Sequence, residues 1–506
     1  MSDNGRTTSL WMATGALEPA PHLAGNAHAD VCVVGAGIAG LTTAYLLAKS
    51  GKNVIVIDDG VTGGGETGRT TAHLATALDD RYYELERLHG TENTRAAAHS
   101  HAAAIDQIER IVRDERIDCD FARVDGYLFV PPGDDLAQLD RELDATRRAG
   151  LTDVERVARA PLTSFDTGPA LHFPRQGQFH VLRYVRGLAE ALERAGSRVY
   201  NNTRATKIEG GRTARVATAA GAITAEAVVV ATNTPVNDLV AIHTKQAAYR
   251  TFVVAVRVAR GSVPQILLWD TPDPYHYVRL QSGPDFDVLM VGGEDHKTGQ
   301  EDDGERRFAR LEEWTRRHFP QAGRVEYRWS GQVIEPVDGL ALIGRNPLDR
   351  DNVYVATGDS GNGMTHGTIA GILLTDLIAG RENPWASLYD PSRKTLGSLK
   401  EFAHENLNVA AQYADLVTPG EVDAVGRIAP GDGAIIRRGL SKVAVYRDEE
   451  GNIHERSAIC PHLGCVVQWN STEKTWDCPC HGSRFGIDGH VANGPAIGEL
   501  QEAKAE

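Results

Sequence analysis

Two short segments near the C-terminal end constrain this chain more than any other feature of its sequence. They read CPHLGC from Cys460 and CPCHGS from Cys478, so each holds a cysteine with a histidine a few residues after it. Cys460 with His462 and Cys478 with His481 therefore make a set of metal ligands. Two cysteines and two histidines suit a structural zinc ion. They also suit a [2Fe–2S] cluster in which two imidazoles replace two thiolates.

The pairing of the ligands favours the cluster over zinc. Zinc sites of this composition usually take both cysteines from one segment and both histidines from another, whereas each segment here contributes one of each. A structural zinc module remains the alternative. The inner cysteines, Cys465 and Cys480, lie beside the ligands and could form a disulfide that ties the two segments together.

Residues 417–500 closely resemble the Rieske proteins of cytochrome bc complexes, whose two loops have nearly the same sequences. The resemblance implies an all-β electron-transfer domain that holds a [2Fe–2S] cluster. The iron ligands that it implies are Cys460, His462, Cys478 and His481, and the disulfide that it implies joins Cys465 to Cys480.

Three further positions follow from the same resemblance. The hydroxyl of Ser483 is expected to bond a cluster sulfur, and residues 493–496 (NGPA) match the proline loop that covers the cluster. Phe485 stands where this family usually has a tyrosine. We therefore expect one hydrogen bond that raises the reduction potential to be missing.

Composition narrows the possible partners. The net charge of −15 argues against binding to nucleic acid or to anionic membrane surfaces, which need a positive footprint. No apolar run approaches the length of a membrane span, and the N-terminus lacks the basic start and apolar core of a secretory signal. Cys32 and Cys119 lie far from the cluster segments and suggest isolated buried thiols. We expect a cytoplasmic protein, in which the cluster domain shelters the disulfide.

A nucleotide-binding pattern begins the first firm element of the chain. A strand, a glycine-rich turn, a helix and a second strand follow one another at residues 29–34, 35–40, 41–49 and 53–58. Gly35 permits the tight turn, Gly37 the approach of a pyrophosphate, and Gly40 close packing of the helix on the strand. The helix N-terminus faces the phosphates, and Asp58 can bond the ribose hydroxyls. This order of elements predicts a dinucleotide site.

A second glycine-rich turn decides which dinucleotide is bound. Residues 353–367 give an apolar strand and the turn GDSGNGMTHG, and a helix is expected over 368–379. With this segment the chain resembles the D-amino-acid oxidase superfamily of FAD-dependent amine oxidoreductases. The resemblance covers about residues 29–378. Its other motifs are the N-terminal fingerprint, VVVATN at 228–233, WSG at 329–331 and PVDGLALIG at 336–344.

This resemblance implies FAD as the cofactor, and it implies an α/β Rossmann-type domain that binds FAD, with an interleaved α+β substrate domain. The expected FAD-binding segments are about 29–80, 200–235 and 335–387, and the substrate segments are about 81–199 and 236–334. Residues 1–28 form an N-terminal extension, 388–416 a helical linker and 417–506 the all-β Rieske domain. The FAD-binding residues carried over are Gly35, Gly37, Gly40, Asp58, Arg69, Thr70, Thr71, Gly361, Asn362, Gly363, Met364 and Thr365.

Residues 249–258 and 262–268 read as strands, and 275–279 with 288–293 as a hairpin. In the superfamily such strands form the sheet over the flavin. The resemblance therefore gives substrate-pocket candidates on this hairpin: Tyr277, Arg279, Glu294 and His296. An arginine can clamp a substrate carboxylate, and aromatic rings can cage an amine. Each candidate could equally be a solvated strand residue.

Three histidines outside these motifs need a separate interpretation. His73 lies near the position at which some relatives attach FAD covalently, but an ordinary packing histidine is the favoured interpretation. His99 and His101 are too closely spaced, on an alanine-rich helix, to support a mononuclear iron site.

Together these modules predict a dehydrogenase. An amine or amino acid would lose a hydride from the carbon next to nitrogen to the flavin. The cluster would then carry the electrons singly to an external acceptor, a redox protein or a quinone. A cluster is redundant when oxygen accepts the electrons, so a dehydrogenase is favoured over an oxidase. The alternative is an electron carrier, or a reductase component fed by a redox partner.

Overall fold

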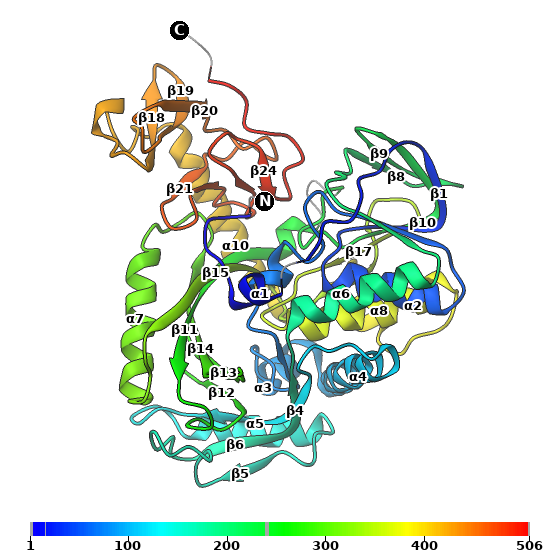
Figure 1. The fold of residues 1–506 in the computed structure, drawn as a ribbon, viewed down its shortest axis with the longest axis vertical. Coiled ribbons are helices and arrows are strands. Elements are labelled where there is room, and N and C mark those ends of the chain that lie inside the picture. Colours follow the sequence, from blue (N-terminus) through cyan, green and yellow to red (C-terminus); the bar gives the residue numbers. More distant parts are fainter. Residues whose placement is uncertain (1–3, 16, 238–241, 504–506) are drawn as a thin grey trace.

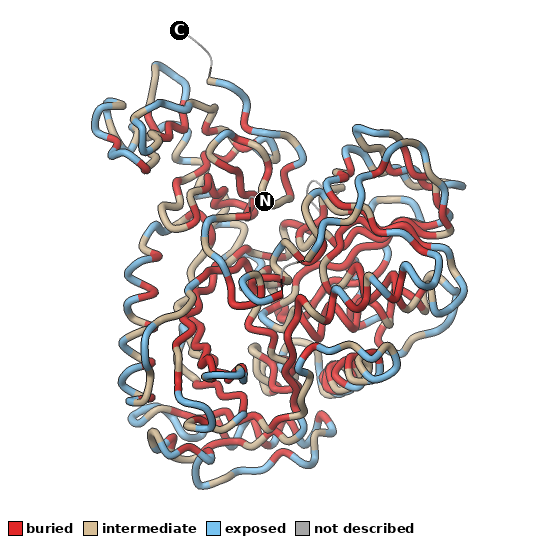
Figure 2. The backbone as a smooth tube through the Cα atoms, viewed as in Figure 1, coloured by how far each residue is buried: buried red, intermediate tan, exposed pale blue. Residues whose placement is uncertain are grey.

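A computed structural model describes residues 4–15, 17–237 and 242–503 of the chain. It contains two large sheets with their helices and, above them in Figure 1, a smaller β domain in orange and red. Buried residues follow the strands of the large sheets and the helices packed on them (Figure 2). None of the helices within the described residues has the length and apolar content needed to cross a membrane.

The first sheet has the strand order β16-β17-β10-β1-β2-β7. Its inner strands pair in parallel and are buried along their apolar runs, as expected for a sheet covered on both faces. The pair β8 and β9 extends it from β10. The strands are β1 (Ala27–Val34), β2 (Val54–Ile57), β7 (Arg198–Tyr200), β8 (Lys207–Glu209), β9 (Ala214–Thr218), β10 (Gly221–Val230), β16 (Leu342–Arg345) and β17 (Val353–Thr357).

Helices α2 (Ile38–Lys49) and α8 (Gly363–Ile378) pack closely against each other beside this sheet. A Cβ atom at Gly371 would lie 2.6 Å from Thr42 Cγ2, so the glycine permits this approach. Helices α4 (Thr91–Glu115) and α6 (Val181–Arg194), which we expected in the substrate domain, pack on α8 and α2 respectively.

The second sheet has the order β15-β11-β14-β13-β12-β4-β6-β3, with β5 beside β6. Its pairs are antiparallel, except that β12 and β4 run in parallel. The strands are β3 (His73–Leu74), β4 (Ala122–Phe129), β5 (Glu155–Val157), β6 (Ala170–Gln178), β11 (Gln246–Val258), β12 (Ile266–Asp270), β13 (His276–Gln281), β14 (Asp287–Lys297) and β15 (Val325–Pro336). The other helices near it are α3 (Tyr82–His89), α5 (Ala137–Arg148) and α7 (Gly304–His318).

Two element boundaries differ from the predictions for physical reasons. The strand predicted at 262–268 begins only at Ile266, because Gly261 has a φ of +70° and Pro264 has no N–H to donate to a neighbouring strand. The late helix begins at Gly363 rather than Thr368. The end of the glycine-rich motif forms the first turn of α8 instead of a loop before it.

Helix α9 (Ala386–Tyr389) spans the expected start of the linker at residue 388, and α10 (Leu399–Gln412) lies within the linker and leads to the C-terminal domain. That domain holds two antiparallel sheets. The strands of one are β18 (Asp432–Arg438), β19 (Ser441–Arg447) and β20 (Ile453–Ser457). Those of the other are β21 (Gln468–Asn470), β22 (Thr475–Asp477), β23 (Arg484–Phe485) and β24 (Val491–Asn493). The N-terminal extension contains α1 (Leu10–Thr14), which was not predicted.

Candidate cofactor cavity and metal centre

A cavity of about 680 Å³ lies at the carboxyl ends of β1, β2 and β10, where open α/β sheets bind their ligands. The glycine-rich turn after β1 forms one of its walls. Gly35 has a φ of +109°, and a Cβ atom there would lie 2.3 Å from the carbonyl oxygen of Ala231. A Cβ atom at Gly40 would lie 1.9 Å from the carbonyl oxygen of Gly35. The turn therefore requires glycine at both positions and fits a dinucleotide.

Asp58 lies at the end of β2 and lines the cavity. Its carboxylate accepts hydrogen bonds from the backbone N–H of Ala36 at 2.6 Å and of Gly60 at 2.9 Å. Burial raises the pKa of Asp58 to about 6, and the charge of Asp59 adds to the rise. The two bonds fix the carboxylate beside the glycine turn, where the ribose of a dinucleotide is expected.

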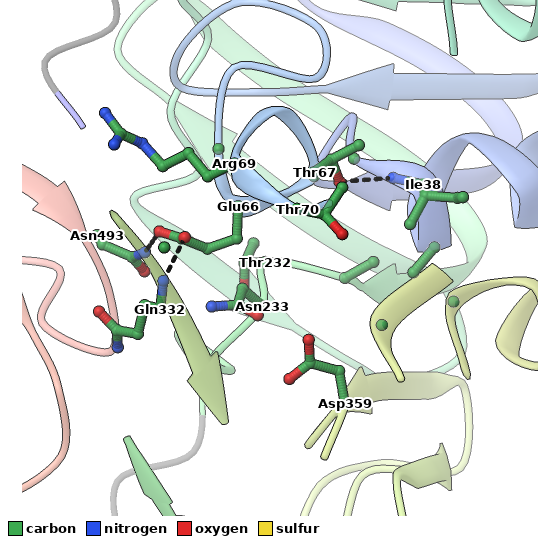
Figure 3. A pocket seen from close by; sticks show the side chains of 18 of the residues that line it. Ile38, Glu66, Thr67, Arg69, Thr70, Thr232, Asn233, Gln332, Asp359 and Asn493 are labelled. Atoms are coloured by element: carbon green, nitrogen blue, oxygen red, sulfur yellow. Dashed lines mark hydrogen bonds between the residues drawn. The ribbon is translucent and has the colours of Figure 1, made fainter. Parts of the chain in front are cut away.

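The segment after β2 forms the next wall through a short 3-10 helix (Glu66–Arg69). Thr67 Oγ1 accepts a hydrogen bond from the N–H of Ile38, at the start of α2 (Figure 3). Thr70 and Thr71 line the cavity, as does Arg69. The Arg69 guanidinium, however, donates to backbone oxygens of Gly5, Thr7 and Ser330. The guanidinium of Arg69 is therefore used in contacts within the protein.

The glycine-rich motif before α8 closes another side. Gly361, Asn362, Gly363 and Met364 line the cavity. Thr365, which was predicted with them, is not among the lining residues. Its hydroxyl oxygen lies 2.8 Å from His101 Nδ1. Thr365 comes one residue after Met364 in the first turn of α8, and at this position the side chain points towards α4. His101, on the alanine-rich helix α4, thus helps to position α8.

Tyr277 is the one substrate candidate among the described lining residues. Its hydroxyl lies 2.7 Å from Thr251 Oγ1, and its ring packs over Gly292. Tyr275, Trp269 and His73 also line the cavity. The ring centroid of Tyr277 lies 5.7 Å from that of Tyr275 and 5.9 Å from that of His73, and that of His73 lies 5.8 Å from that of Trp269. His73 Nδ1 lies 2.9 Å from Thr71 Oγ1, and burial followed by the charge of Arg279 lowers the pKa of His73 to about 3.

The structure does not bring the other three candidates to the cavity. Arg279 is fully buried and donates to the carbonyl oxygens of Thr71 and Ala72, both at 2.9 Å. Glu294 accepts from Arg310 at 2.6 Å, and His296 stacks on Phe252.

A bulge in β14 explains the places of Glu294 and His296. The register between β11 and β14 shifts next to Gly293, which has a φ of +143°, and Glu294 has a φ of +59°. The bulge breaks the alternation of side chains. It turns Asp295, which sequence reasoning missed, into the cavity. The paired glycines Gly292 and Gly293 within a strand were the available signal.

Carboxylates gather at this end of the cavity, where Asp79, Asp295 and Glu335 line it together. Burial raises the pKa of Asp295 to about 7, and it also raises the pKa values of Asp79 and Glu335. Repulsion from neighbouring carboxylates raises the pKa values of Asp295 and Glu335 further. Tyr275 donates its hydroxyl to Asp79 Oδ2 at 2.7 Å. A cation placed here would relieve the repulsion between these groups.

The four predicted cluster ligands meet between two loops of the C-terminal domain. Cys460 and Cys478 are buried free thiols, and the imidazoles of His462 and His481 lie 5.0 Å apart between ring centroids. Burial lowers the pKa of His481 to about 3, so this imidazole is neutral, the form that binds iron. A disulfide joins Cys465 and Cys480, the pairing that the resemblance implied. These residues fit a [2Fe–2S] cluster.

The cluster loops lie against the wall of the cavity. Gln332 of β15 lines the cavity and donates its side-chain amide to the carbonyl oxygen of Gly482 at 3.0 Å. His243 lies on a short 3-10 helix (His243–Lys245) before β11. Its ring centroid lies 4.9 Å from that of His462 and 5.9 Å from that of His481.

Comparison with known proteins accounts for both parts of the chain. The family model for FAD dependent oxidoreductases matches residues 30–377, and the model for the Rieske [2Fe-2S] domain matches residues 418–504. The chain belongs to the FAD-dependent oxidoreductases. It carries a C-terminal Rieske domain, so it is an oxidoreductase that binds FAD and a [2Fe–2S] cluster. These matches confirm the predicted modules and cofactors.

Relatives share one or both modules with this FAD-dependent oxidoreductase. The Rieske 2Fe-2S iron-sulfur protein YhfW of Bacillus subtilis (strain 168) is 31% identical over 98% of this chain and 97% of its own. Gamma-glutamylputrescine oxidoreductase of Escherichia coli (strain K12) is 30% identical over 74% of this chain and 89% of its own. Glycine oxidase from Geobacillus kaustophilus has the fold of the first module, with 21% identity and a TM-score of 0.60 over 73% of this chain and 99% of its own.

Proposed function

We propose that this protein is an amine dehydrogenase that delivers electrons from its substrate to its own Rieske cluster. FAD supplies a hydride acceptor for the carbon next to the amine nitrogen, and the cluster supplies a one-electron relay. A substrate bound as an ammonium ion would first give an N–H proton to a carboxylate of the cavity. The neutral amine would then lose two electrons and a proton from carbon as a hydride, and leave as an iminium ion that water hydrolyses. The electrons finally leave for an external redox protein or a quinone.

One observation carries the electron route. The side chain of Gln332 spans from the cavity wall to Gly482, and Gly482 directly follows the predicted ligand His481. His243 lies against both predicted histidine ligands from the same side. The histidine side of the metal centre therefore faces the module that holds FAD, which is the arrangement that transfer within one chain needs.

The lining of the cavity supports a cationic substrate. Asp79, Asp295 and Glu335 lie beside the rings of Tyr275 and Tyr277, and a bound cation would favour their ionised form. Carboxylates pair with an ammonium group, and aromatic faces attract it further. The name of the relative gamma-glutamylputrescine oxidoreductase contains the amine putrescine, which agrees with this chemistry.

A carboxylate clamp of the kind that an amino acid would use finds less support. The Arg279 guanidinium donates to backbone oxygens beneath the cavity. Arg69 and Arg204 are the arginines among the described lining residues. Arg69 is bound to the N-terminal segment, and Arg204 lies 3.5 Å from Asp59. We therefore favour amines without an α-carboxylate.

An anaerobic titration tests the proposal. Purified protein is mixed with polyamines, N-alkylated amines and α-amino acids, while flavin bleaching is followed by absorbance and the reduced cluster by electron paramagnetic resonance. We expect an amine to bleach the flavin and a Rieske signal to follow. In the variant His481→Ala the flavin should still bleach without that signal. If no amine bleaches the flavin but a reduced redox protein does, the electron-carrier interpretation replaces this one.

A further inference from the structure

The FAD cavity is lined by both modules of the chain. Residues of the C-terminal domain between His490 and Ile497 line the same cavity as the glycine turn of α2 and the carboxylate of Asp58. Figure 3 shows Asn493 reaching into this region from β24, opposite the 3-10 helix that carries Glu66. A wall of the cofactor cavity is thus supplied by a domain that the family assigns to the iron–sulfur cluster.

Specific polar contacts hold this wall in place. Asn493 donates its side-chain amide to Glu66 Oε1 at 3.1 Å, and Glu66 Oε2 accepts from the N–H of Gln332 at 2.6 Å (Figure 3). Glu66 therefore joins strands from both modules at the cavity. Arg204 adds a second link, because it lies 3.5 Å from Asp59 and 3.5 Å from the carbonyl oxygen of Val491.

The same loop also reaches the cluster side. The N–H of Ala496 donates to Ser483 Oγ at 3.0 Å, and Ser483 follows the second pair of predicted ligands. The segment 490–497 consequently contacts the cluster-binding loop and the FAD cavity at once. A change in the conformational order of residues 490–497 would therefore affect both the cluster-binding loop and the FAD cavity.

Buried charges fix the two modules against each other. Glu473 of the C-terminal domain lies 3.4 Å from Arg69 and 3.3 Å from Arg250, and these side chains are 0%, 2% and 1% exposed. Arg69 belongs to the segment that lines the cavity. The docking of the C-terminal domain and the shape of the FAD site are therefore determined by the same residues.

We propose that the Rieske domain is a structural part of the FAD site, with residues 490–497 as a wall whose order and the binding of FAD stabilise each other. Asn493 is the positioning residue of this wall, acting through Glu66. Coupling of this kind is reciprocal. If the ordered loop strengthens the binding of FAD by a given factor, bound FAD must favour the ordered loop by the same factor. This coupling is independent of the substrate and of the direction of electron flow.

Hydrogen exchange on the wild-type chain gives the first test. Cluster-loaded protein freed of FAD is compared with the same protein after FAD is added back. Exchange in peptides spanning 488–497 should slow several-fold, whereas peptides spanning 441–447 on β19 should not change, since they lie outside the cavity. Equal exchange at 488–497 with and without FAD would overturn the proposal.

A variant gives the second test. Asn493→Ala should release FAD about 2- to 10-fold faster, the loss expected for one hydrogen bond, as measured by the recovery of flavin fluorescence after dilution. Asn452→Ala in the same domain is the control, because Asn452 is exposed and bonds Asp448 away from the cavity. An unchanged Rieske signal would verify that the domain is intact. Equal release rates in the two variants would contradict the role of Asn493.

Discussion

Replacement of Glu473 by glutamine probes the contact that holds the two modules together. Its carboxylate also accepts from the N–H of Thr7 at 3.0 Å. The charges of Arg69, Arg250 and Arg484 outweigh burial and lower the pKa of Glu473 from 4.5 to about 2. A difference of this size corresponds to about 3 kcal/mol. Removing one partner from a buried ion pair costs about 3 to 5 kcal/mol, so we expect Glu473→Gln to lose about 3 kcal/mol.

Urea unfolding measures this loss, since guanidinium salts would screen the ion pairs. The flavin fluorescence reports on the first module, and the visible circular dichroism of the cluster reports on the second. Glu450→Gln is the matched control, because Glu450 is an exposed glutamate of the same domain. We expect the Glu473→Gln variant to lose both signals at a lower urea concentration than the control. Equal midpoints for the two variants would refute the reasoning.

The sign of the pH effect follows from the depressed pKa. The ionised carboxylate of Glu473 stabilises the folded protein fully above the unfolded value of about 4.5. Its contribution is lost as the pH falls from there towards 2, the pKa of the folded state. The difference in stability between the wild type and Glu473→Gln should therefore be constant near neutral pH and shrink below about pH 4.5.

Three other substitutions test other parts of the molecule. The pKa of Asp295 is raised to about 7. We therefore expect kcat/KM to rise with pH through about 7 for an amine that is protonated in solution over this range. Asp295→Asn should abolish this rise and increase KM about tenfold, the loss of one charge-assisted bond. Gly40→Ala should prevent FAD binding, because its Cβ would lie 1.9 Å from the Gly35 oxygen, whereas Gly426→Ala, with open space around it, should retain the flavin absorbance on gel filtration. His243→Phe should lower the reduction potential of the cluster in film voltammetry, because an apolar ring replaces a polar one beside the ligands; an unchanged potential would count against this contact.

Local sequence motifs predicted the fold classes and the fingerprint part of the site. The glycine turn before α2 and the two cluster loops are contiguous, and their spacing alone limits the geometry that they can adopt. Tyr277 and the other substrate candidates were predicted from the family resemblance, and of these Tyr277 lines the cavity. The prediction failed for Glu294 and His296, because a bulge at Gly293 shifts the side chains that follow by one position.

Contacts between distant segments could not be read from the sequence. Asn493 and Glu66 are 427 positions apart, and Glu473 and Arg69 are 404 apart. Neither pair is marked by periodicity or by a motif. Residues 1–28 were predicted only as an N-terminal extension, yet backbone oxygens of Gly5 and Thr7 accept hydrogen bonds from the Arg69 guanidinium. Such contacts arise only when both modules are folded and docked.

The chemistry of the contact between the modules bears on electron transfer. An apolar interface can slide among orientations of similar energy, whereas a buried carboxylate between arginines is satisfied in few of them. Glu473 and Gln332 both bond across the contact between the modules, Glu473 to arginines of the FAD module and Gln332 to Gly482 of the Rieske domain. Each side chain reaches its partners in one placement of the Rieske domain. The distance between the FAD cavity and the metal centre is therefore set by hydrogen bonds and charge. For this reason a substitution such as Glu473→Gln, far from any reacting atom, should slow the reduction of the cluster more than the bleaching of the flavin.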